Sequence, residues 1–496
     1  VGEATDQVRV TVKNAYVEGL RVTELMYDPI EGSEAEFIEL KNIGPVTLDL
    51  TSVAFTEGIA YTFSSGTLAP GALVVVAKNR AVFVNTCGNG AWLAAGEYNP
   101  TSLASEGESI TLVDPDGIVI VNFSYDDEWY PVTAGKGFSL TIVDPDMGDA
   151  TDWSDKESWA PSSELGGSPG EDDSGQTSMT GDVKINEIMA HSDNELPDWI
   201  ELRNEGATSV DIGGWYLSDK YGTENDLKRY QIAEGTVLAP GGYAVFYEDE
   251  NFGFLSTDPG CLVPFALSEN GETVYLSAAQ NGELTGYPEQ EDFGASEVGV
   301  SMGRYTKSTG STNFVALSQP TPGQANAYPL VGPVVISEIM YNPVTADEDK
   351  EFVELHNITD QTVALYDSKL VPWKFTRGLG YTLPSSLTIP PKGFVVVVKN
   401  PAAFFAAYGE MPAGVRVVGP YTAALSNGGE KLELSKPGEV VDLVRQYIRV
   451  DRVTYDDANG WPTSADGEGD SLTRRVMENY GNDPANWKAA PPTPGR

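Results

Sequence analysis

The sequence predicts an all-β protein made of three related domains in tandem. A pair of strand-like stretches occurs three times, with 163 residues from Glu24 to Glu187 and 151 from Glu187 to Glu338. Each spacing is the size of one domain and is too long for a solenoid repeat. Short apolar runs and period-two alternation dominate, and 52 glycines and 32 prolines supply frequent turns. Helical character is confined to 401–409, where a proline begins and a glycine ends about two turns.

The repeated stretches are two strands separated by a polar loop. In the first copy they are 22–26, Val-Thr-Glu-Leu-Met, and 36–42, Glu-Phe-Ile-Glu-Leu-Lys-Asn. The corresponding stretches are 185–189 with 198–204 in the second copy, and 336–340 with 351–357 in the third. Two later landmarks also recur, a proline–glycine turn before a buried strand (68–71, 238–241, 389–393) and a Leu-x-x-x-Gly-Glu stretch (103–108, 267–272, 425–430).

These landmarks predict the domain boundaries. We expect an N-terminal β-strand segment at 1–19, domains at 20–172, 183–330 and 331–496, and a flexible linker at 173–182. The linker assignment rests on a composition rich in Ser, Gly, Glu and Asp without apolar periodicity. Each repeat holds at most one of the two cysteines, Cys87 and Cys261, so no disulfide within a domain is possible.

The formal net charge of -42 limits the classes of partner. A surface this acidic repels phosphate backbones and anionic lipid, which argues against nucleic-acid or membrane-surface binding. It keeps a protein soluble and favours cationic partners. No apolar run reaches the ~18 residues of a transmembrane helix, so we expect no membrane insertion.

The ordered set of motifs resembles the bacterial lamin-tail domain, and the resemblance covers 20–496 three times over. It implies an immunoglobulin-like β-sandwich for each repeat. It also implies a secreted or surface-attached bacterial protein, because such domains occur in multidomain proteins of that kind. The copies diverge most at the third strand, where Trp215 of the second repeat has no aromatic counterpart at 44–50. A sandwich fold carries no chemistry by itself.

The N-terminal segment places Val8, Val10 and Val12 on one face of an amphipathic strand. A lone strand cannot bury these valines. It resembles the closing strand of immunoglobulin-like modules that precede such domains. Three interpretations remain open: a remnant of a preceding domain, a strand paired with an edge of repeat one, or a strand donated to another subunit.

The recurrent carboxylates are the first candidate site. Alternation places Ile38 and Leu40 inward and Glu39 outward, and Glu24 lies on the preceding strand. Two facing carboxylates repel unless something bridges them, and a Ca²⁺ ion would do so with Glu36 as a further ligand. The equivalent residues are Glu187, Asp198 and Glu201 in repeat two, and Glu338, Glu351 and Glu354 in repeat three. The alternatives, which we favour, are neutralisation by the basic residue two positions along (Lys41, Arg203 or His356) or hydrogen bonds to loop amides.

A second candidate calcium site is the acidic loop containing Asp144, Asp146, Asp149 and Asp152. The loop lacks the Asp/Asn-Gly pair of the EF-hand pattern and its final bidentate glutamate. A surface turn is the favoured interpretation.

The sequence gives little evidence for a catalytic site. Asp126 and Asp127 lie near Trp129 and could be read as glycosidase acids beside a sugar-stacking ring, but repeat two has no such pair with a tryptophan. The two histidines, His191 and His356, fall in different repeats, and His356 is expected at an exposed strand position. No nucleophile elbow, Cys–His pairing or phosphate-binding glycine loop is present. We therefore expect no enzyme.

The function that the sequence favours is a non-enzymatic extracellular or cell-surface array with a structural or adhesive role. Its partners would be proteins, including further copies that assemble into a fibre or surface layer through the N-terminal strand. The alternative is a carbohydrate- or polymer-binding module accessory to a secreted hydrolase. Exposure of Trp129, Trp215 and Trp461 on one face would favour that alternative, and their burial would count against it.

Overall fold

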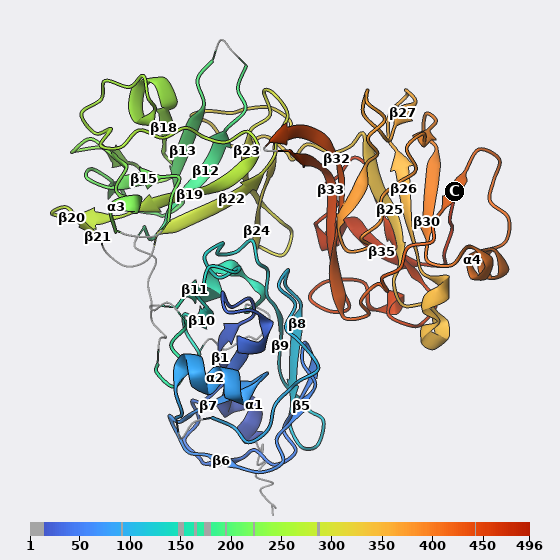
Figure 1. The fold of residues 1–496 in the computed structure, drawn as a ribbon, viewed down its shortest axis with the longest axis horizontal. Helices are drawn as coiled ribbons and strands as arrows, with labels where there is room; N and C mark the ends of the chain where they lie inside the picture. Colours follow the sequence, from blue (N-terminus) through green and yellow to red (C-terminus); the bar gives the residue numbers. More distant parts are fainter. Residues whose placement is uncertain are drawn as a thin grey trace, which may run out of the picture. The chain divides into compact units, whose positions relative to one another are not determined.

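The computed structural model describes residues 14–496 except 91–92, 147–152, 163–165, 173–179, 194–195, 222–223, 285–287 and 442 (Figure 1). The predicted strand at 8–12 lies outside these residues. The chain forms two compact units. The first consists of 1–105, 109–125 and 132–175, and the second of 176–496 together with 106–108 and 126–131. No helix among the described residues is long and apolar enough to cross a membrane.

Repeat one forms most of the first unit. Its elements are α1 (Ala15–Gly19), β1 (Leu20–Met26), β2 (Phe37–Asn42), β3 (Leu48–Asp49), β4 (Ala54–Glu57), β5 (Tyr61–Thr62), β6 (Thr67–Leu68), β7 (Leu73–Ala77), α2 (Arg80–Cys87), β8 (Ser109–Val113), β9 (Val119–Ser124), β10 (Leu140–Ile142) and β11 (Trp159–Pro161). One sheet has the order β11-β10-β1-β2-β7 and the other β5-β4-β8-β9, with β3-β6 as a short ribbon.

Repeat two has the same two-sheet plan. Its elements are β12 (Val183–Met189), β13 (Trp199–Asn204), β14 (Val210–Asp211), β15 (Tyr216–Ser218), α3 (Glu224–Leu227), β16 (Tyr230–Gln231), β17 (Val237–Leu238), β18 (Tyr243–Tyr247), β19 (Gly271–Ser277), β20 (Ala279–Gln280), β21 (Glu283–Leu284), β22 (Glu289–Gly294), β23 (Met302–Thr306) and β24 (Thr312–Ala316). The main sheets have the orders β18-β13-β12-β23-β24 and β16-β15-β19-β22.

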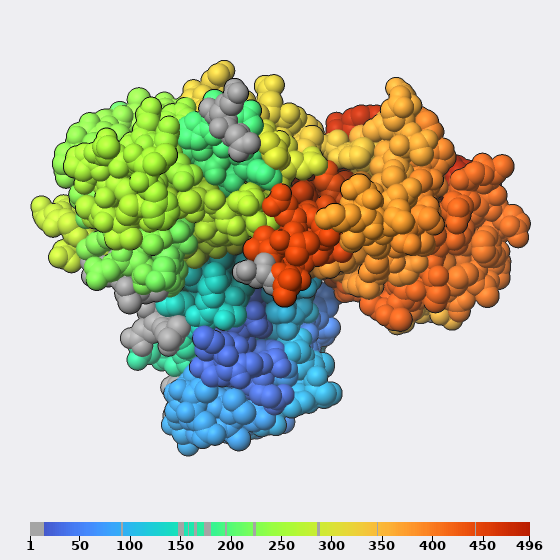
Figure 2. Space-filling model, turned by 45° about the horizontal axis from the view of Figure 1, so that its top comes forward, coloured from blue at the N-terminus to red at the C-terminus, as the bar shows by residue number. Residues whose placement is uncertain are grey.

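Repeat three adds a long hairpin to this plan. Its elements are β25 (Val334–Met340), β26 (Phe352–Asn357), β27 (Val363–Ala364), β28 (Lys374–Arg377), β29 (Thr388–Ile389), β30 (Phe394–Val398), α4 (Pro401–Tyr408), β31 (Arg416–Val418), β32 (Gly429–Val441), β33 (Val444–Asp456), β34 (Ser471–Arg474) and β35 (Trp487–Ala490). The sheets are β31-β30-β26-β25-β34-β35 and β28-β32-β33. The hairpin reaches repeat two within the second unit, where Lys436 pairs with Glu297, and Figure 2 shows it in orange-red on the surface.

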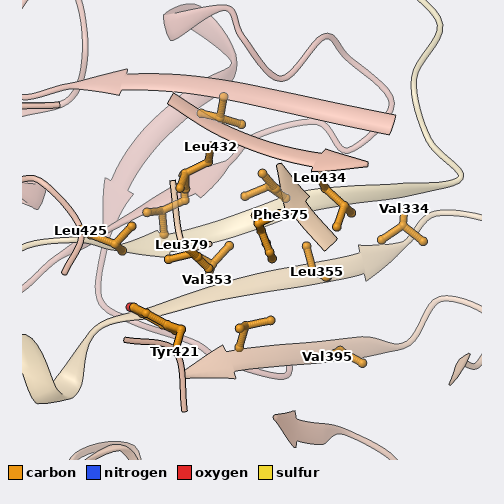
Figure 3. Packing of buried hydrophobic residues seen from close by; sticks show 14 of the residues in the cluster. Val334, Val353, Leu355, Phe375, Leu379, Val395, Tyr421, Leu425, Leu432 and Leu434 are labelled. Atoms are coloured by element: carbon orange, nitrogen blue, oxygen red, sulfur yellow. The ribbon is translucent and has the colours of Figure 1, made fainter. Parts of the chain in front are cut away.

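The core of each repeat lies between its two sheets, as a sandwich requires. In repeat three, Val353 and Leu355 of β26 face Phe375 of β28 and Leu432 and Leu434 of β32, and all five are buried (Figure 3). The prediction of tandem immunoglobulin-like β-sandwiches is confirmed. The helix predicted at 401–409 is also confirmed as α4, with Asn400 as its N-cap, Pro401 at its start and Gly409 at its end.

One expectation from strand alternation is wrong. The outward face of the first sheet is not exposed, because α2 packs over it and joins Phe83 to a second cluster with Met26, Phe37 and Val75. Glu39 on the same face is 1% exposed, and the Gly170 amide lies 2.6 Å from its Oε2. His356, expected at an exposed position, is 8% exposed, and its Nδ1 lies 3.1 Å from the carbonyl oxygen of Gly393. In repeat one, helix α2 and the segment at the end of the repeat thus cover the face that alternation predicted to be polar and exposed.

Candidate functional site

The recurrent glutamates face each other across a β-bulge in every repeat. Glu24 of β1 lies opposite Glu39 of β2, and the register shifts between Val22 and Glu24. The same shift precedes Glu187 and Glu338, which lie opposite Glu201 and Glu354. A bulge inserts one residue and re-aims its side chain. The sequence pattern had suggested this pairing, and the structure confirms it.

The residue in each bulge donates a hydrogen bond to the second glutamate. Thr23 Oγ1 lies 2.8 Å from Glu39 Oε1. Asn186 Nδ2 lies 2.7 Å from Glu201 Oε1, and Ser337 Oγ lies 2.7 Å from Glu354 Oε1. Three different side chains thus make the same contact, since each carries a donor on a short stem.

A closing segment at the end of each repeat supplies backbone donors to both glutamates. The segments are Ser168-Pro-Gly170, Thr321-Pro-Gly323 and Thr493-Pro-Gly495. In repeat one, the Ser168 amide lies 2.8 Å from Glu24 Oε1, and the Gly170 amide lies 2.6 Å from Glu39 Oε2. Thr321 and Gly323 bind Glu187 and Glu201 in the same way, as do Thr493 and Gly495 with Glu338 and Glu354.

A serine beside the late strand completes each site by donating to the first glutamate. Ser301 Oγ lies 2.6 Å from Glu187 Oε1, and Ser139 and Ser471 bind Glu24 and Glu338 correspondingly. We call the two glutamates with their bulge, serine and closing-segment donors the glutamate cradle. It joins the first two strands of a repeat to residues more than 110 positions later, because Ser301 and Glu187 are 114 apart.

Burial changes the acidity of the cradle. All six glutamates are between 0% and 2% exposed. Desolvation disfavours a charged carboxylate, and it raises the pKa of Glu39 and Glu201 to about 7 and that of Glu354 to about 8, although the glycine amides oppose the shift. Burial also raises the pKa of Glu338. Each cradle therefore holds a proton close to neutral pH, and its carboxylates have no open access to a substrate.

The calcium hypothesis for these residues stays a prediction. A void of about 10 Å³ adjoins Glu24 and Glu39, enough for about one water molecule. Across the described residues, no group of three or more His, Cys, Asp or Glu side chains is arranged to hold a metal ion. Calcium needs six to eight oxygen ligands, whereas the carboxylate oxygens here already accept amide and hydroxyl donors.

Of the two alternatives to calcium, hydrogen bonding to loop amides is the one that the structure shows. The basic residues pair elsewhere: Lys41 binds Asp172, and Arg203 Nη1 lies 3.7 Å from Glu205 Oε1. Amide and hydroxyl dipoles therefore face the glutamates of each cradle.

Glu36, Asp198 and Glu351, the remaining acidic residues of the three predicted calcium sites, lie away from the facing glutamates. The Glu36 carboxylate accepts hydrogen bonds from the Leu103 amide at 2.9 Å and Ser102 Oγ at 2.7 Å, and it pairs with Lys78 at 3.2 Å. Glu351 correspondingly accepts from the Leu425 amide and the Tyr421 hydroxyl, and burial raises its pKa to about 7. Asp198 accepts from the Ser192 amide at 3.0 Å. These residues fasten the start of the second strand to neighbouring loops.

The predicted acidic loop is described only in part. Asp144 Oδ1 accepts a hydrogen bond of 2.9 Å from the Asp146 amide in an exposed turn. Asp149 and Asp152 lie outside the described residues, as do Val8, Val10 and Val12. The second calcium site and the assembly strand stay predictions.

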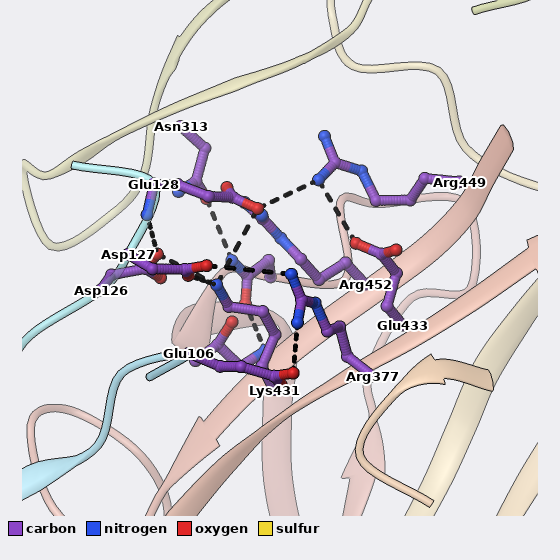
Figure 4. A network of polar contacts seen from close by, with 12 residues as sticks. Glu106, Asp126, Asp127, Glu128, Asn313, Arg377, Lys431, Glu433, Arg449 and Arg452 are labelled. Carbon is purple, nitrogen blue, oxygen red and sulfur yellow. Dashed lines mark hydrogen bonds and ion pairs between the residues drawn. The ribbon is translucent and has the colours of Figure 1, made fainter. Parts of the chain in front are cut away.

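The acids considered for glycoside hydrolysis take part in an ion-pair network of the second unit (Figure 4). Lys431 Nζ lies 3.0 Å from Asp126 Oδ1 and 2.7 Å from Asp127 Oδ1. Burial raises the pKa of Asp127 to about 7, and Lys431 opposes that shift. Glu128 pairs with Arg452, and this contact helps to hold its pKa low. The carboxylates are engaged with buried cations, which assigns them a structural role.

Sequence reasoning found the glutamates but missed their donors. The Pro-Gly endings at 169–170, 322–323 and 494–495 recur visibly, and that recurrence was the available signal for the closing segments. The signature asparagines Asn42, Asn204 and Asn357 were also missed. Each is fully buried and donates to at least two backbone carbonyls, for example Asn42 Nδ2 to Val46 and Leu68 at 2.8 Å.

Comparison with protein families gives three matches to one model, the Lamin Tail Domain. They cover residues 14–127, 176–289 and 329–449. No curated protein matches the chain. Each family match ends before the serine and the closing segment of its repeat, so the donors that complete the cradle lie beyond the matched part.

Proposed function

Because the chain belongs to the Lamin Tail Domain family, with three copies in tandem, we propose that it is a non-enzymatic extracellular or cell-surface protein with a structural or adhesive role. Tandem immunoglobulin-like sandwiches of this family are structural or interaction modules. One observation carries the proposal. In all three repeats a pair of facing glutamates is buried and hydrogen-bonded to the end of its own repeat. These hydrogen bonds fasten the end of each repeat to its first two strands, which is a structural role.

The charge of the chain supports the extracellular setting. A net charge of -42 keeps an array of sandwiches soluble and favours cationic partners over nucleic acid. The localisation is tested by antibody labelling of intact host cells, with permeabilised cells as the control. Signal on intact cells supports the proposal, whereas signal only after permeabilisation contradicts it.

Self-assembly through the N-terminal strand is the finer form of the proposal. The alternating valines at 8–12 would complete a sheet in a second copy. Light scattering compares the full chain with a variant lacking residues 1–13, each with Ca²⁺ and with chelator. Assembly that disappears on deletion supports strand donation, and a monomer in every condition contradicts it. An unchanged melting temperature in chelator would contradict calcium binding.

The carbohydrate-binding alternative receives little support from the tryptophans. Trp215 and Trp461 are 8% and 7% exposed and belong to the cores of repeats two and three, and Trp129 is half-buried. A stacking platform needs exposed ring faces. We expect no retention of the chain on insoluble polysaccharides in a pull-down.

A further inference from the structure

Repeats one and three both cover the outer side of the strand next to β2 or β26. In repeat one, Leu93 forms a parallel bridge with Val75 of β7, and the Ala94 amide donates to the Val75 carbonyl oxygen at 2.8 Å. In repeat three, β31 runs parallel to β30 and places Val417 beside Val396. Val75 and Val396 are both 0% exposed. The chain that follows the helix α2 or α4 thus returns to the sheet and pairs with this strand.

Repeat two leaves the equivalent strand, β18, unpaired on its outer side. Val245 of β18 is the counterpart of Val75 and Val396, because each valine lies opposite the second glutamate of its cradle. Among the described residues of repeat two, no strand or bridge pairs with the outer side of β18, which ends the sheet β18-β13-β12-β23-β24 (Figure 1). Val245 is half-buried, as are Tyr243 and Tyr247 on the same face.

The chain after β18 explains this difference. It enters the short helical turn η4 (Glu248–Phe252), and the Phe252 ring stacks on that of Phe265 at 4.6 Å in the core of repeat two. Cys261 then forms a bridge with Tyr230 of the opposite sheet. The segment that returns to the first sheet in repeats one and three is therefore used on the second sheet in repeat two.

The backbone of Val245 presents hydrogen-bonding groups to the open side. Alternate residues of an antiparallel strand bond to the neighbouring strand. The Asn204 amide donates to the Gly242 carbonyl oxygen at 3.0 Å, and the Glu248 amide donates to the Asp198 carbonyl oxygen at 2.8 Å. Even-numbered residues of β18 therefore bond to β13, and the amide and carbonyl of Val245 point away from it.

A segment near the N-terminus repeats the sequence that covers β30 in repeat three. The covering chain there reads Val415-Arg416-Val417, and its two valines pack against the cluster around Phe352. The same tripeptide stands at Val8-Arg9-Val10 and nowhere else in the sequence. In the register of repeat three, Val10 would lie beside Val245, and the valines of 8–12 would pack on the half-buried face of β18.

Charge is matched at the end of this register. Glu248 begins a run of three acidic residues that includes Asp249 and Glu250. Burial raises the pKa of Glu248, and nearby Asp198 and Asp249 add to the effect, because burial and like charges both disfavour the ionised carboxylate. Lys13, three residues after Val10, would lie beside Glu248 and offset this repulsion.

We propose that β18 of repeat two accepts residues 8–12 of a second copy as an added parallel strand, in the place that β31 occupies in repeat three. This acceptor role rests on the proposed self-assembly and identifies the surface that receives the strand. The Val245 amide would donate to the Arg9 carbonyl oxygen. The Thr11 amide would donate to the Val245 carbonyl oxygen, as the amide after Leu93 does to Val75 in repeat one.

The first test is disulfide trapping between two variants of the full chain, both in a background of Cys87→Ser and Cys261→Ser. One variant carries Val10→Cys and the other Val245→Cys, and directly paired residues lie within the reach of a disulfide. A size tag on one variant distinguishes mixed dimers from dimers of a single variant. We expect mixed dimers on oxidation. Thr11→Cys is the matched control, because its side chain points to the opposite face, and its yield should be at least about fivefold lower.

The second test changes the edge and measures assembly by light scattering. Val245→Lys places a charge on the edge strand and should raise the concentration needed for assembly at least about tenfold. Val237→Lys, at a 56% exposed position of β17, is the control that should leave assembly unchanged. The smaller change Val245→Cys keeps the trapping test decisive if lysine unfolds the repeat.

The outcomes separate the acceptor from self-assembly itself. Assembly that deletion of residues 1–13 abolishes but Val245→Lys leaves unchanged would overturn the acceptor and leave self-assembly standing. A monomer in every condition, with no mixed dimers, would contradict both. A disulfide that forms only within a chain carrying both cysteines would assign the strand to its own copy and would also overturn the proposal.

Discussion

A glutamate buried beside another glutamate retains its proton at higher pH than one in water, and this gives the protein a defined pH dependence. The pKa of Glu39 and Glu201 rises to about 7 and that of Glu354 to about 8, from an ordinary 4.5. Because the folded pKa exceeds the unfolded pKa, the stabilising contribution is complete below about pH 4.5 and is lost as the pH rises through 7 to 8. We expect the free energy of unfolding to fall as the pH rises to that range, by about 3 kcal/mol for the cradles of Glu39 and Glu201 and about 5 kcal/mol for that of Glu354, measured by urea denaturation.

A neutral variant separates the cradle from other buried acids. Burial also raises the pKa of Glu272 to about 7, so the wild-type slope contains several contributions. Glu201→Gln removes the contribution of one cradle to the pH dependence of the free energy of unfolding. Glu272→Gln is the matched control outside the cradle. A pH dependence that Glu201→Gln leaves unchanged would contradict the assignment.

The serine of each cradle offers a second test at the residue scale. Ser301 is fully buried and donates to Glu187, so Ser301→Ala leaves an acceptor with one donor fewer. We expect a loss of about 1–3 kcal/mol in the free energy of unfolding. Ser318→Ala changes an exposed serine nearby and should stay within about 0.5 kcal/mol. Equal effects of the two substitutions would rule out a special role for Ser301.

At the scale of elements, the sequence was informative wherever the signal was local. Alternation predicted the strand pair that brings Glu24 opposite Glu39, and the Pro401 and Gly409 boundaries predicted α4. The cradle donors could not be predicted in this way, because Ser139 meets Glu24 across 115 residues of chain. The burial of Glu39 was missed for a similar reason, since Gly170, whose amide binds it, lies 131 residues further along the chain.

The late strands of repeats two and three share a buried arginine that repeat one lacks. Arg474 lies three residues after Ser471, and its Nη1 is 2.7 Å from Asp451 Oδ2. Arg304 has the same spacing from Ser301 and pairs with Glu289 and Glu291. The repeat-one counterpart, three residues after Ser139, is the buried Ile142. An apolar residue is therefore compatible with this position when no charged partner faces it.

This comparison predicts an asymmetric response to substitution. Arg474→Ile alone leaves Asp451 buried without its cation and should lower the free energy of unfolding by about 3–5 kcal/mol. Arg474→Ile with Asp451→Asn removes both charges, and the neutral amide oxygen can still accept the Ile336 amide. We expect the double variant to recover at least half of the loss in urea denaturation. A double variant as unstable as the single one would contradict the argument.

At the scale of the whole molecule, the repeat count and the family followed from the sequence, because three copies of an ordered motif set exclude chance agreement. The contacts between repeats two and three did not follow. The Tyr480 amide donates a hydrogen bond to the Tyr328 hydroxyl at 2.8 Å, and the Tyr480 ring lies 5.3 Å from that of Tyr305. Such contacts join residues more than 150 positions apart, and no pattern within one repeat encodes them.

The aromatic cluster predicts that repeats two and three unfold together. Val315, Leu317 and Tyr480 are buried in one cluster, and the Tyr480 hydroxyl bonds to Asn313 at 3.1 Å. Tyr480→Ala removes the ring that both repeats contact, with a loss of about 3 kcal/mol. We expect calorimetry to resolve two transitions for this variant and a single one for the second unit of the wild type. Tyr480→Phe keeps the ring and loses one hydrogen bond, about 1 kcal/mol, so a single transition should persist. Separate transitions already present in the wild type would show that the cluster does not couple the two repeats.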